Sequence, residues 1–199
     1  EHFAYYFCYP DINNVMRLLE NHDTDRFLLE DPENLNVYKQ AVTMLLTIPG
    51  IPQLYYGQEL LMTGSTKKDF GYVRPDMPGG WNGDEISVFQ ESGRTAMQQE
   101  AFNFMKKMLH WRKGNAAISK GKMKHFMPRS NVYVYERSYN GKSILVIMNG
   151  VNKEVDLDLT FYKEVIGDRT NSKNVLTDSN VPLGKKLHLQ PKEVLVLEL

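Results

Sequence analysis

The residues of this 199-residue chain most able to do chemistry are an adjacent imidazole and carboxylate, His22 and Asp23. They directly follow a short apolar run, residues 15–19, which is typical of a β-strand. In barrels of parallel strands the reacting groups lie at the carboxyl ends of the strands, where rigid backbone holds them beside an open cleft. The tripeptide Asn21-His22-Asp23 alone would more often be a surface turn or a helix cap.

A second sequence motif supports the interpretation of His22 and Asp23 as site residues. Residues 50–59 read Gly-Ile-Pro-Gln-Leu-Tyr-Tyr-Gly-Gln-Glu, and residues 51–56 of this block have the length and composition of a strand. Between the blocks, Asp31-Pro32-Glu33 is a helix start, with an N-cap, a proline at the first position and an acidic first turn. The apolar positions that follow repeat at three and four residues: Val37, Ala41, Met44, Leu45 and Ile48. Strand, helix and strand at this spacing predict a parallel βαβ unit, so that both strand ends face the same side.

Together the two blocks resemble the α-amylase family of retaining glycoside hydrolases. In that family an Asn-His-Asp end of barrel strand seven is followed by a Gly-Ile-Pro-x-x-Tyr-Tyr-Gly-x-Glu strand eight. The stretch is most similar to the neopullulanase, cyclomaltodextrinase and maltogenic amylase branch, partly because of residues 74–81, Arg-Pro-Asp-Met-Pro-Gly-Gly-Trp. The resemblance covers residues 5–115 at the level of motifs, and it implies the C-terminal part of a (β/α)8 TIM barrel.

The resemblance also implies roles for individual residues. Asp23 would be the transition-state stabiliser, accepting hydrogen bonds from the 2- and 3-hydroxyls of the reacting glucose, and His22 would donate to the same region. Asp69 and Arg74 would bind a sugar two units away, although their spacing is one residue longer than the commoner pattern. Arg26 is a candidate substrate-binding residue that could equally form a salt bridge beneath the loop. The nucleophile and the general acid come from earlier strands in the family, and no segment here resembles the motifs that bear them.

Neighbouring polar and aromatic residues have structural explanations as well. We expect Asn21 to satisfy backbone groups at the strand end, Tyr55 and Tyr56 to fill the barrel rim, and Glu59 to act as a structural hydrogen-bond acceptor after a turn that Gly57 permits. The long loop over residues 60–94 carries groups that suit a sugar ring, and packing of the loop on itself is equally expected. These groups are Asp69, Phe70, Tyr72, Arg74, Asp76 and Trp81.

From about residue 116 the apolar period changes to two. Strands are expected over residues 123–127, 132–137, 143–148, 154–159 and 193–199, with a tight hairpin at Asn140-Gly141. Such short strands between Gly, Asn and Pro predict an antiparallel β-sandwich. The expected fold class is therefore α/β plus all-β: residues 1–114 supply barrel strands seven and eight with their helices, and residues 115–199 form a C-terminal sandwich domain.

Composition limits the possible partners. Lys and Arg number 24, as do Asp and Glu, so no net field favours nucleic acid or an anionic membrane. No apolar run has the length of a membrane span. The histidines show no ligand spacing, so neither a metal nor another cofactor is expected, and the family's common calcium site belongs to a segment without a counterpart here. The single Cys8 allows no internal disulfide and is expected to be buried.

We therefore expect the C-terminal part of an α-glucan hydrolase that cleaves α-1,4-glucosidic bonds in starch, maltooligosaccharides, cyclodextrins or pullulan, inactive by itself. The start of the sequence, at Glu1, looks like the end of an element already under way. A glucanotransferase of the same family and a non-catalytic glucan-binding or subunit protein are the alternatives. An open sheet edge would require the rest of the barrel or a second copy. A periplasmic or secreted location is expected ahead of a cytoplasmic one.

Overall fold

The computed structural model describes residues 2–29 and 34–199, so the predicted helix start at Asp31-Pro32-Glu33 lies outside the described residues. The chain divides into two compact units. One unit joins Glu1–Val15, Leu46–Ile51 and Met108–Leu199, and the other joins Met16–Leu45 and Pro52–Lys107. The predicted domain boundary at residues 114 and 115 stays a prediction.

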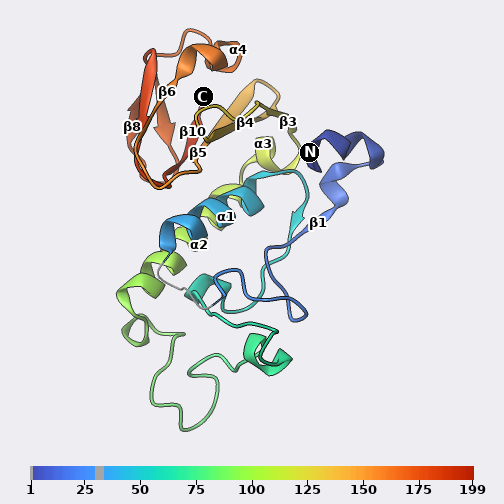
Figure 1. Cartoon of the computed structure of the whole chain (residues 1–199), viewed down its shortest axis with the longest axis vertical. Helices are drawn as coiled ribbons and strands as arrows, with labels where there is room; N and C mark the ends of the chain where they lie inside the picture. Colours follow the sequence, from blue (N-terminus) through green and yellow to red (C-terminus); the bar gives the residue numbers. More distant parts are fainter. Residues whose placement is uncertain (1, 30–33) are drawn as a thin grey trace. The chain divides into compact units, whose positions relative to one another are not determined.

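The first unit contains the predicted β-sandwich. A six-stranded antiparallel sheet has the order β3-β4-β5-β10-β7-β8, and a second sheet pairs β6 with β9, also antiparallel (Figure 1). The strands are β3 (Lys122–His125), β4 (Val132–Tyr139), β5 (Lys142–Asn149), β6 (Val155–Asp158), β7 (Asn171–Asn174), β8 (Asn180–Pro182), β9 (Lys186–Leu189) and β10 (Val194–Glu198). The five strands expected from sequence are therefore present, with ends that differ by a few residues.

Alternate residues of the central strands enter one core. Leu145 and Ile147 of β5, with Leu195 and Leu197 of β10, pack with apolar residues of β6 and β9. The opposite face of β5 is also buried, because Ile144 and Val146 are 3% and 0% exposed. Burial on both faces explains why β5 is continuously apolar and does not alternate with polar residues.

Strands β7, β8 and β9 were not expected from sequence. Strand β7 has no apolar residue, and β8 and β9 are only three and four residues long, although Leu187 and Leu189 of β9 do alternate with polar residues. Ser172 and Asn174 of β7 are buried polar residues whose side chains bond to the neighbouring backbone. The Ser172 hydroxyl donates to the Glu198 carbonyl at 2.6 Å, and the Asn174 side-chain oxygen accepts from the Leu176 amide at 3.1 Å. Because β7 buries hydrogen-bonded polar side chains and no apolar ones, its sequence lacks the apolar alternation that indicates a strand.

Local turn chemistry agrees with the sequence at the hairpin between β4 and β5. Asn140 and Gly141 both have positive φ, 49° and 79°, as a two-residue hairpin turn requires.

This unit also contains short helices: α3 (Ala116–Ser119), α4 (Lys163–Ile166) and 3-10 turns at His2–Cys8, Ile12–Asn14 and Leu159–Tyr162. Cys8 is exposed, so the expectation that it is buried was wrong.

The two strands of the expected βαβ arrangement are present, but they are short. Strand β1 covers Met16–Arg17 and β2 covers Ile51–Pro52, in place of the five and six residues expected. The Ile51 amide donates to the Val15 carbonyl at 2.9 Å, and the Gln53 amide donates to the Arg17 carbonyl at 2.7 Å. Because both residue numbers rise together, the two strands run parallel, as predicted.

Two helices accompany these strands: α1 (Leu35–Thr47) and α2 (Ala96–Lys113). A capping box begins α2, since the Thr95 amide donates to the Gln98 side-chain oxygen and the Gln98 amide donates to the Thr95 hydroxyl. The buried side of α1 differs from the predicted stripe: Tyr38, Val42, Leu45 and Leu46 are buried, while Val37, Ala41 and Met44 are half-buried.

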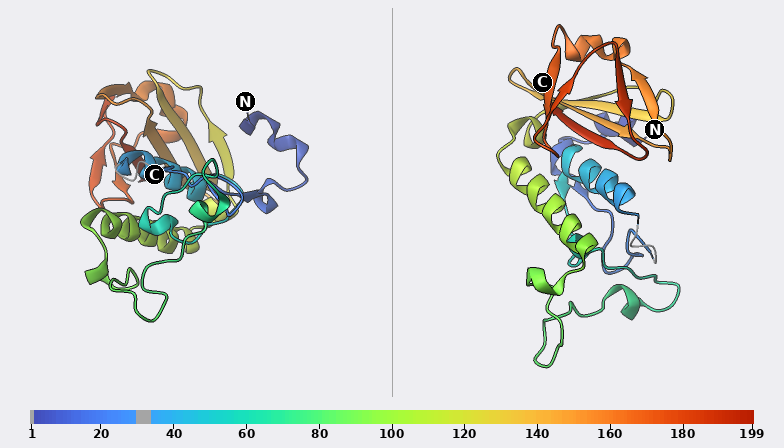
Figure 2. Two further views of the ribbon diagram at one scale, coloured as in Figure 1. Left: turned by 60° about the horizontal axis from the view of Figure 1, so that its bottom comes forward. Right: turned by 90° about the vertical axis from the view of Figure 1, so that its left-hand side faces the viewer.

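Residues 60–94 form the predicted long loop, with little regular structure apart from 3-10 turns (Figure 2). These turns lie at Gln58–Leu60, Phe70–Val73 and Glu91–Gly93. Among the residues that the structure describes, no helix is both long enough and apolar enough to cross a membrane.

Candidate active site

The segment after β1 is a tight turn held by its own side chains. The Asn21 side-chain oxygen accepts from the Asp23 amide at 2.8 Å, and the Asn21 amide donates to the Thr24 hydroxyl at 3.0 Å. The expectation that Asn21 satisfies backbone groups is thus confirmed. The turn leaves the side chains of His22 and Asp23 free to point outward, each 61% exposed.

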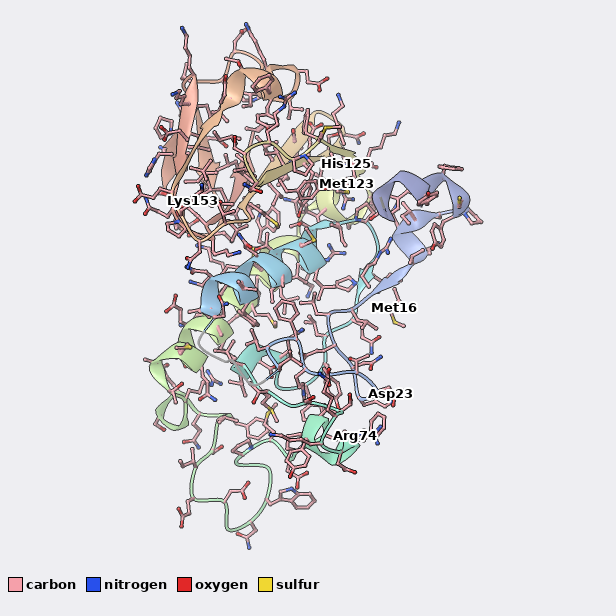
Figure 3. All side chains as sticks on the ribbon, viewed as in Figure 1. Met16, Asp23, Arg74, Met123, His125 and Lys153 are labelled. Atoms are coloured by element: carbon pink, nitrogen blue, oxygen red, sulfur yellow. The ribbon has the colours of Figure 1, made fainter. Side chains whose placement is uncertain are left out.

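Asp23 lies between two nitrogen-bearing side chains. His22 Nε2 is 3.2 Å from one carboxylate oxygen, and Arg74 Nη2 is 3.1 Å from the other. The Arg74 Nε also donates to the His22 carbonyl at 2.9 Å, so the guanidinium is fixed by two contacts with the turn. Figure 3 shows Asp23 and Arg74 beside each other. The structure therefore brings together three of the predicted site residues, although 51 positions separate Asp23 from Arg74.

Asp69 and Arg74 flank the same 3-10 turn, Phe70–Val73. The Asp69 carboxylate caps that turn by accepting from the Gly71 amide at 2.7 Å. The Arg74 guanidinium lies 5.2 Å from the Phe70 ring centroid, a cation–π distance. Asp69 therefore shapes the loop segment that presents Arg74, and its contact with a sugar stays a prediction.

The structure corrects the substrate-binding role assigned to Arg26. Its side chain is fully buried and forms a salt bridge with Glu20 at 3.1 Å. The guanidinium also donates to the carbonyl oxygens of Tyr56 at 2.6 Å and Val73 at 3.1 Å. A group with no exposed surface cannot contact a sugar. Arg26 instead forms the alternative that the sequence left open, a salt bridge beneath the loop. Its hydrogen bonds join the turn to the segments that contain Tyr56 and Val73.

Burial governs the electrostatics of this pair. Glu20 is 2% exposed, and this burial raises the pKa of its carboxyl above the ordinary value, while the Phe27 amide and Arg26 oppose the increase. The pair carries compensating charges, and each partner holds further hydrogen bonds, which is the condition for keeping ions in an apolar interior. Glu20 was not predicted from sequence, because nothing local marks it as the partner of Arg26.

Asp25 also joins the turn to the long loop by hydrogen bonds, and the sequence did not predict this role. One of its carboxylate oxygens accepts from the Ser65 hydroxyl, the Thr66 amide and the Thr66 hydroxyl, at 2.6–3.1 Å. These bonds stabilise the charged form and lower the pKa of Asp25 below 3.8. The Arg26 amide also donates to the Gly64 carbonyl at 3.0 Å. The loop start is thereby attached to the turn that carries Asp23.

The aromatic pair after β2 is only partly buried. Tyr56 is 39% exposed and donates its hydroxyl to the Pro75 carbonyl at 2.8 Å, so the expectation of a filled rim was wrong for this residue. Tyr55 and Tyr56 pack edge to face at 4.6 Å, with the Arg26 guanidinium 4.1 Å from the Tyr55 ring centroid. Gly57 has φ of 78°, which confirms that it permits the turn. The role expected for Glu59 stays a prediction.

This geometry suits recognition of a polar, uncharged ligand. A solvent-facing carboxylate can accept hydrogen bonds from paired hydroxyls, and the neighbouring imidazole and guanidinium can donate to them. Across the described ranges, no cluster of three or more His, Cys, Asp or Glu residues is arranged to hold a metal ion. The exposed Asp23 carboxylate, with His22 and Arg74 beside it, suits hydrogen-bonded binding and charge stabilisation.

Two family models match the chain. Residues 9–99 match the α-amylase catalytic domain, and residues 123–198 match the cyclo-malto-dextrinase C-terminal domain. A cyclomaltodextrin glucanotransferase from Bacillus sp. strain 6.6.3 is 32% identical over 86% of this chain, and a cyclomaltodextrinase from Thermoanaerobacter pseudethanolicus is 28% identical over 94%. The alignments span 22% and 29% of those relatives' own lengths.

Solved structures show the same fold. A noncanonic maltogenic α-amylase from Thermotoga neapolitana superposes with a TM-score of 0.71 at 21% identity, covering 100% of this chain and 45% of that one. The fold class expected from sequence, the C-terminal part of a TIM barrel followed by a β-sandwich, is confirmed. Because residues 9–99 match the α-amylase catalytic domain and residues 123–198 match the C-terminal domain of cyclo-malto-dextrinases, the chain belongs to the α-amylase family.

Proposed function

We propose that this chain supplies the part of an α-glucan-processing glycosidase that binds and stabilises the reacting sugar. The observation that carries the proposal is the Asp23 carboxylate, exposed in the turn that follows β1 and flanked by His22 and Arg74 at 3.2 and 3.1 Å. The names of the relatives, cyclomaltodextrinase and cyclomaltodextrin glucanotransferase, support an α-glucan as the substrate class. The bonds to be cleaved are α-1,4-glucosidic.

In this proposal Asp23 accepts hydrogen bonds from the 2- and 3-hydroxyls of the reacting glucose. Such bonds strengthen as positive charge develops on the ring in the oxocarbenium-like transition state, which accelerates the reaction. His22 donates to the same hydroxyl region and fixes the orientation of the ring. Arg74 and Asp69 bind a sugar unit of the same glucan, two units from the reacting glucose. Arg26 acts through other residues, since it is buried beneath the turn and holds Asp23 and the loop in place.

A retaining mechanism also requires a nucleophilic carboxylate and a general acid about 5 Å apart. We assign both to barrel strands that precede the present residues, so this chain alone is proposed to be inactive. Contact with those strands or with a second copy, and a periplasmic or secreted location, belong to the same proposal.

Hydrolysis and sugar transfer share this site and differ in whether water or another sugar accepts the glycosyl group. Relatives of both kinds support keeping transfer as the second candidate. Incubating the intact protein with maltotriose separates them, because hydrolysis increases reducing ends while transfer yields longer oligosaccharides at a constant number of ends. A non-catalytic glucan-binding or subunit protein would bind maltotriose and yield neither product.

Replacement of Asp23 by Asn tests the proposed role. In the intact protein, Asp23→Asn is expected to lower turnover by orders of magnitude, because the amide cannot stabilise developing positive charge, and to leave the melting temperature nearly unchanged because the side chain is exposed. Asp168→Asn, at another exposed aspartate, is the matched control and should retain activity. Turnover of Asp23→Asn equal to that of the wild type would refute the role.

A further inference from the structure

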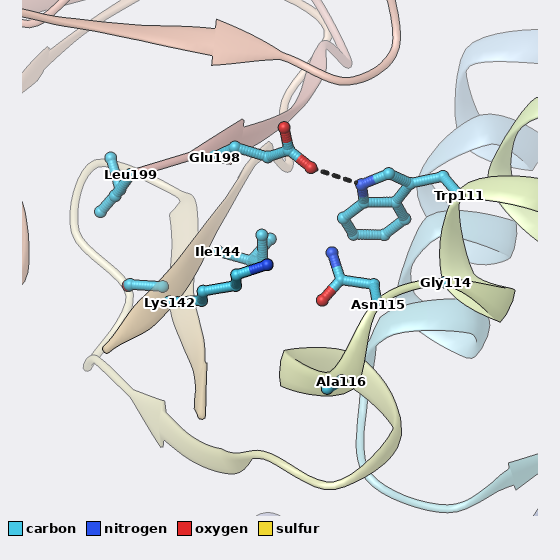
Figure 4. Close-up of a pocket in the computed structure, with 9 residues that line it drawn as sticks. Trp111, Gly114, Asn115, Ala116, Lys142, Ile144, Glu198 and Leu199 are labelled. Carbon is cyan, nitrogen blue, oxygen red and sulfur yellow. Dashed lines mark hydrogen bonds between the residues drawn. The ribbon is translucent and has the colours of Figure 1, made fainter. Parts of the chain in front are cut away.

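A pocket of about 470 Å³ lies in the β-sandwich unit and uses none of the residues of the candidate active site. It is formed where the end of α2 and the start of α3 meet the start of β5 and the end of β10 (Figure 4). Its lining comprises Trp111, Gly114, Asn115, Ala116, Lys142, Ser143, Ile144, Glu198 and Leu199.

Strand register explains why the key side chains converge. Ile144 of β5 pairs with Glu198 of β10, and Lys142 lies two residues before Ile144, so all three side chains are on one face of the sheet. Ile144 is 3% exposed and forms an apolar floor, while Lys142 and Glu198 are exposed. In Figure 4 the Trp111 and Asn115 side chains project from the helical side toward these groups.

Trp111 is held in place by Glu198. Its indole Nε1 donates to the Glu198 carboxylate at 2.7 Å, which joins α2 to β10 and leaves the indole half-buried at the pocket. Asn115 is fixed as well, because its side-chain oxygen accepts from the Ala117 amide at 3.0 Å. The aromatic and amide groups are therefore positioned before any ligand binds, which reduces the entropy lost on binding.

The chemistry of the lining favours a neutral, polyhydroxylated ligand. One ammonium and one carboxylate line the pocket, so their charges cancel and neither an anion nor a cation is favoured. The nearby Lys173, which pairs in register with Glu198, is engaged with Asp178 at 2.9 Å. A sugar has an apolar CH face that packs on an indole, and vicinal hydroxyls that bond to a carboxylate and an ammonium.

We propose that this pocket is a second, non-catalytic saccharide-binding site that takes one glucose unit of an α-glucan. Trp111 packs against the sugar ring, and Glu198 and Lys142 bond its hydroxyls. The choice of an α-glucan rests on the proposed function, whereas the saccharide class rests on the lining alone. Such a site would hold a long substrate to the protein while its reacting bond is processed elsewhere.

Fluorescence of Trp111 can report on this pocket alone. These 199 residues contain two tryptophans, so in this chain the Trp81→Phe variant has Trp111 as its only indole. In this background, titration with maltotriose is expected to give a saturable change in Trp111 emission. Adding Lys142→Ala with Glu198→Gln should weaken binding at least tenfold, while the glutamine oxygen still accepts from the indole. Lys153→Ala with Glu154→Gln, an exposed pair outside the pocket, should leave binding unchanged.

The outcomes separate this inference from the proposed function. Absence of a maltotriose response, or an equal response in the Lys142 and Glu198 variant whose melting curve shows it to be folded, overturns the site. A response to cellotriose as strong as to maltotriose overturns the α-glucan assignment. Repeating the titration with Asp23→Asn added should give the same affinity. If Asp23→Asn leaves turnover intact while Trp111 still responds, the function fails and the site stands.

Discussion

Among the described residues, each unit contains one fully buried arginine, and the two positive charges are stabilised by different groups. Arg26, beneath the candidate active site, faces the carboxylate of Glu20 at 3.1 Å. Arg137, on β4, donates to three carbonyl oxygens, those of Thr47, Ile118 and Gly121, at 2.6–2.8 Å. Burial lowers the pKa of Arg137 to about 10, which leaves it charged at neutral pH.

The difference reflects what each region lacks. The sandwich has a ladder of backbone hydrogen bonds, and Arg137 needs only to satisfy carbonyl groups, among them Thr47 at the end of α1. The segments around Asp23 have almost no ladder, since β1 and β2 are two residues each. There the Arg26–Glu20 ion pair joins the segments, so the position of the exposed Asp23 depends on a buried ion pair.

The largest expected effect comes from breaking that pair. Arg26→Met leaves the Glu20 carboxylate buried without its partner, which should cost about 3–5 kcal/mol of unfolding free energy. Arg137→Met leaves no carboxylate behind and should cost about 1–3 kcal/mol from the unsatisfied carbonyls. Urea denaturation measures both values.

The comparison becomes sharper with a double variant. Adding Glu20→Leu to Arg26→Met should recover much of the lost stability, because the buried charge is then removed altogether. Equal costs for the two single variants, or no recovery in the double variant, would show that charge compensation does not distinguish the regions.

Two glycines with nearly identical φ angles provide a smaller test. Gly57, before the turn at Gln58–Leu60, has φ of 78°, and Gly141, in the hairpin of the sandwich, has φ of 79°. Alanine at either position should cost about 1–2 kcal/mol for the left-handed backbone. A Cβ on Gly57 would also lie 2.0 Å from Met62 Sδ, whereas Gly141 has nothing within 4 Å. Gly57→Ala should therefore melt at the lower temperature, and equal melting temperatures would contradict the packing argument.

The smallest effects concern pH and have opposite signs in the two regions. The pKa of Asp25 is lowered by its bonds to Thr66 and Ser65, so its contribution to stability is present above pH 3.8 and is lost as pH falls through the lower folded value. The pKa of His188, on β9, is raised above 6.5 by its hydrogen bond with Asp156, so its contribution is present below pH 6.5 and is lost as pH rises through the folded value.

Melting temperatures of Asp25→Asn and His188→Gln, measured from pH 2 to 9 against the wild type, check both signs. The difference for Asp25→Asn should shrink in acid, and the difference for His188→Gln should shrink above neutrality. Because His188 is exposed and Asp25 is only half-buried, the shifts should be small. A difference that grows in those windows would reverse the assigned cause.

Much of the fold could be predicted from local pattern. Period-two runs located five strands, and Asn140-Gly141 located the hairpin. These features depend on a few consecutive residues, which is why sequence reveals them. Strand β7 was missed because its buried residues are polar and are satisfied by β10, a partner that sequence does not indicate.

The sequence by itself determined the family and the pairing of His22 with Asp23 at a strand end, because motif spacing and adjacency are properties of the chain. It also proposed Arg74, which contacts Asp23 from 51 residues away. Only the tertiary structure decided that Arg26 is buried and joins distant segments, since its hydrogen-bond partners Tyr56 and Val73 lie 30 and 47 residues further on. A buried charge is defined by what surrounds it in space, and one-dimensional pattern carries no record of those distant neighbours.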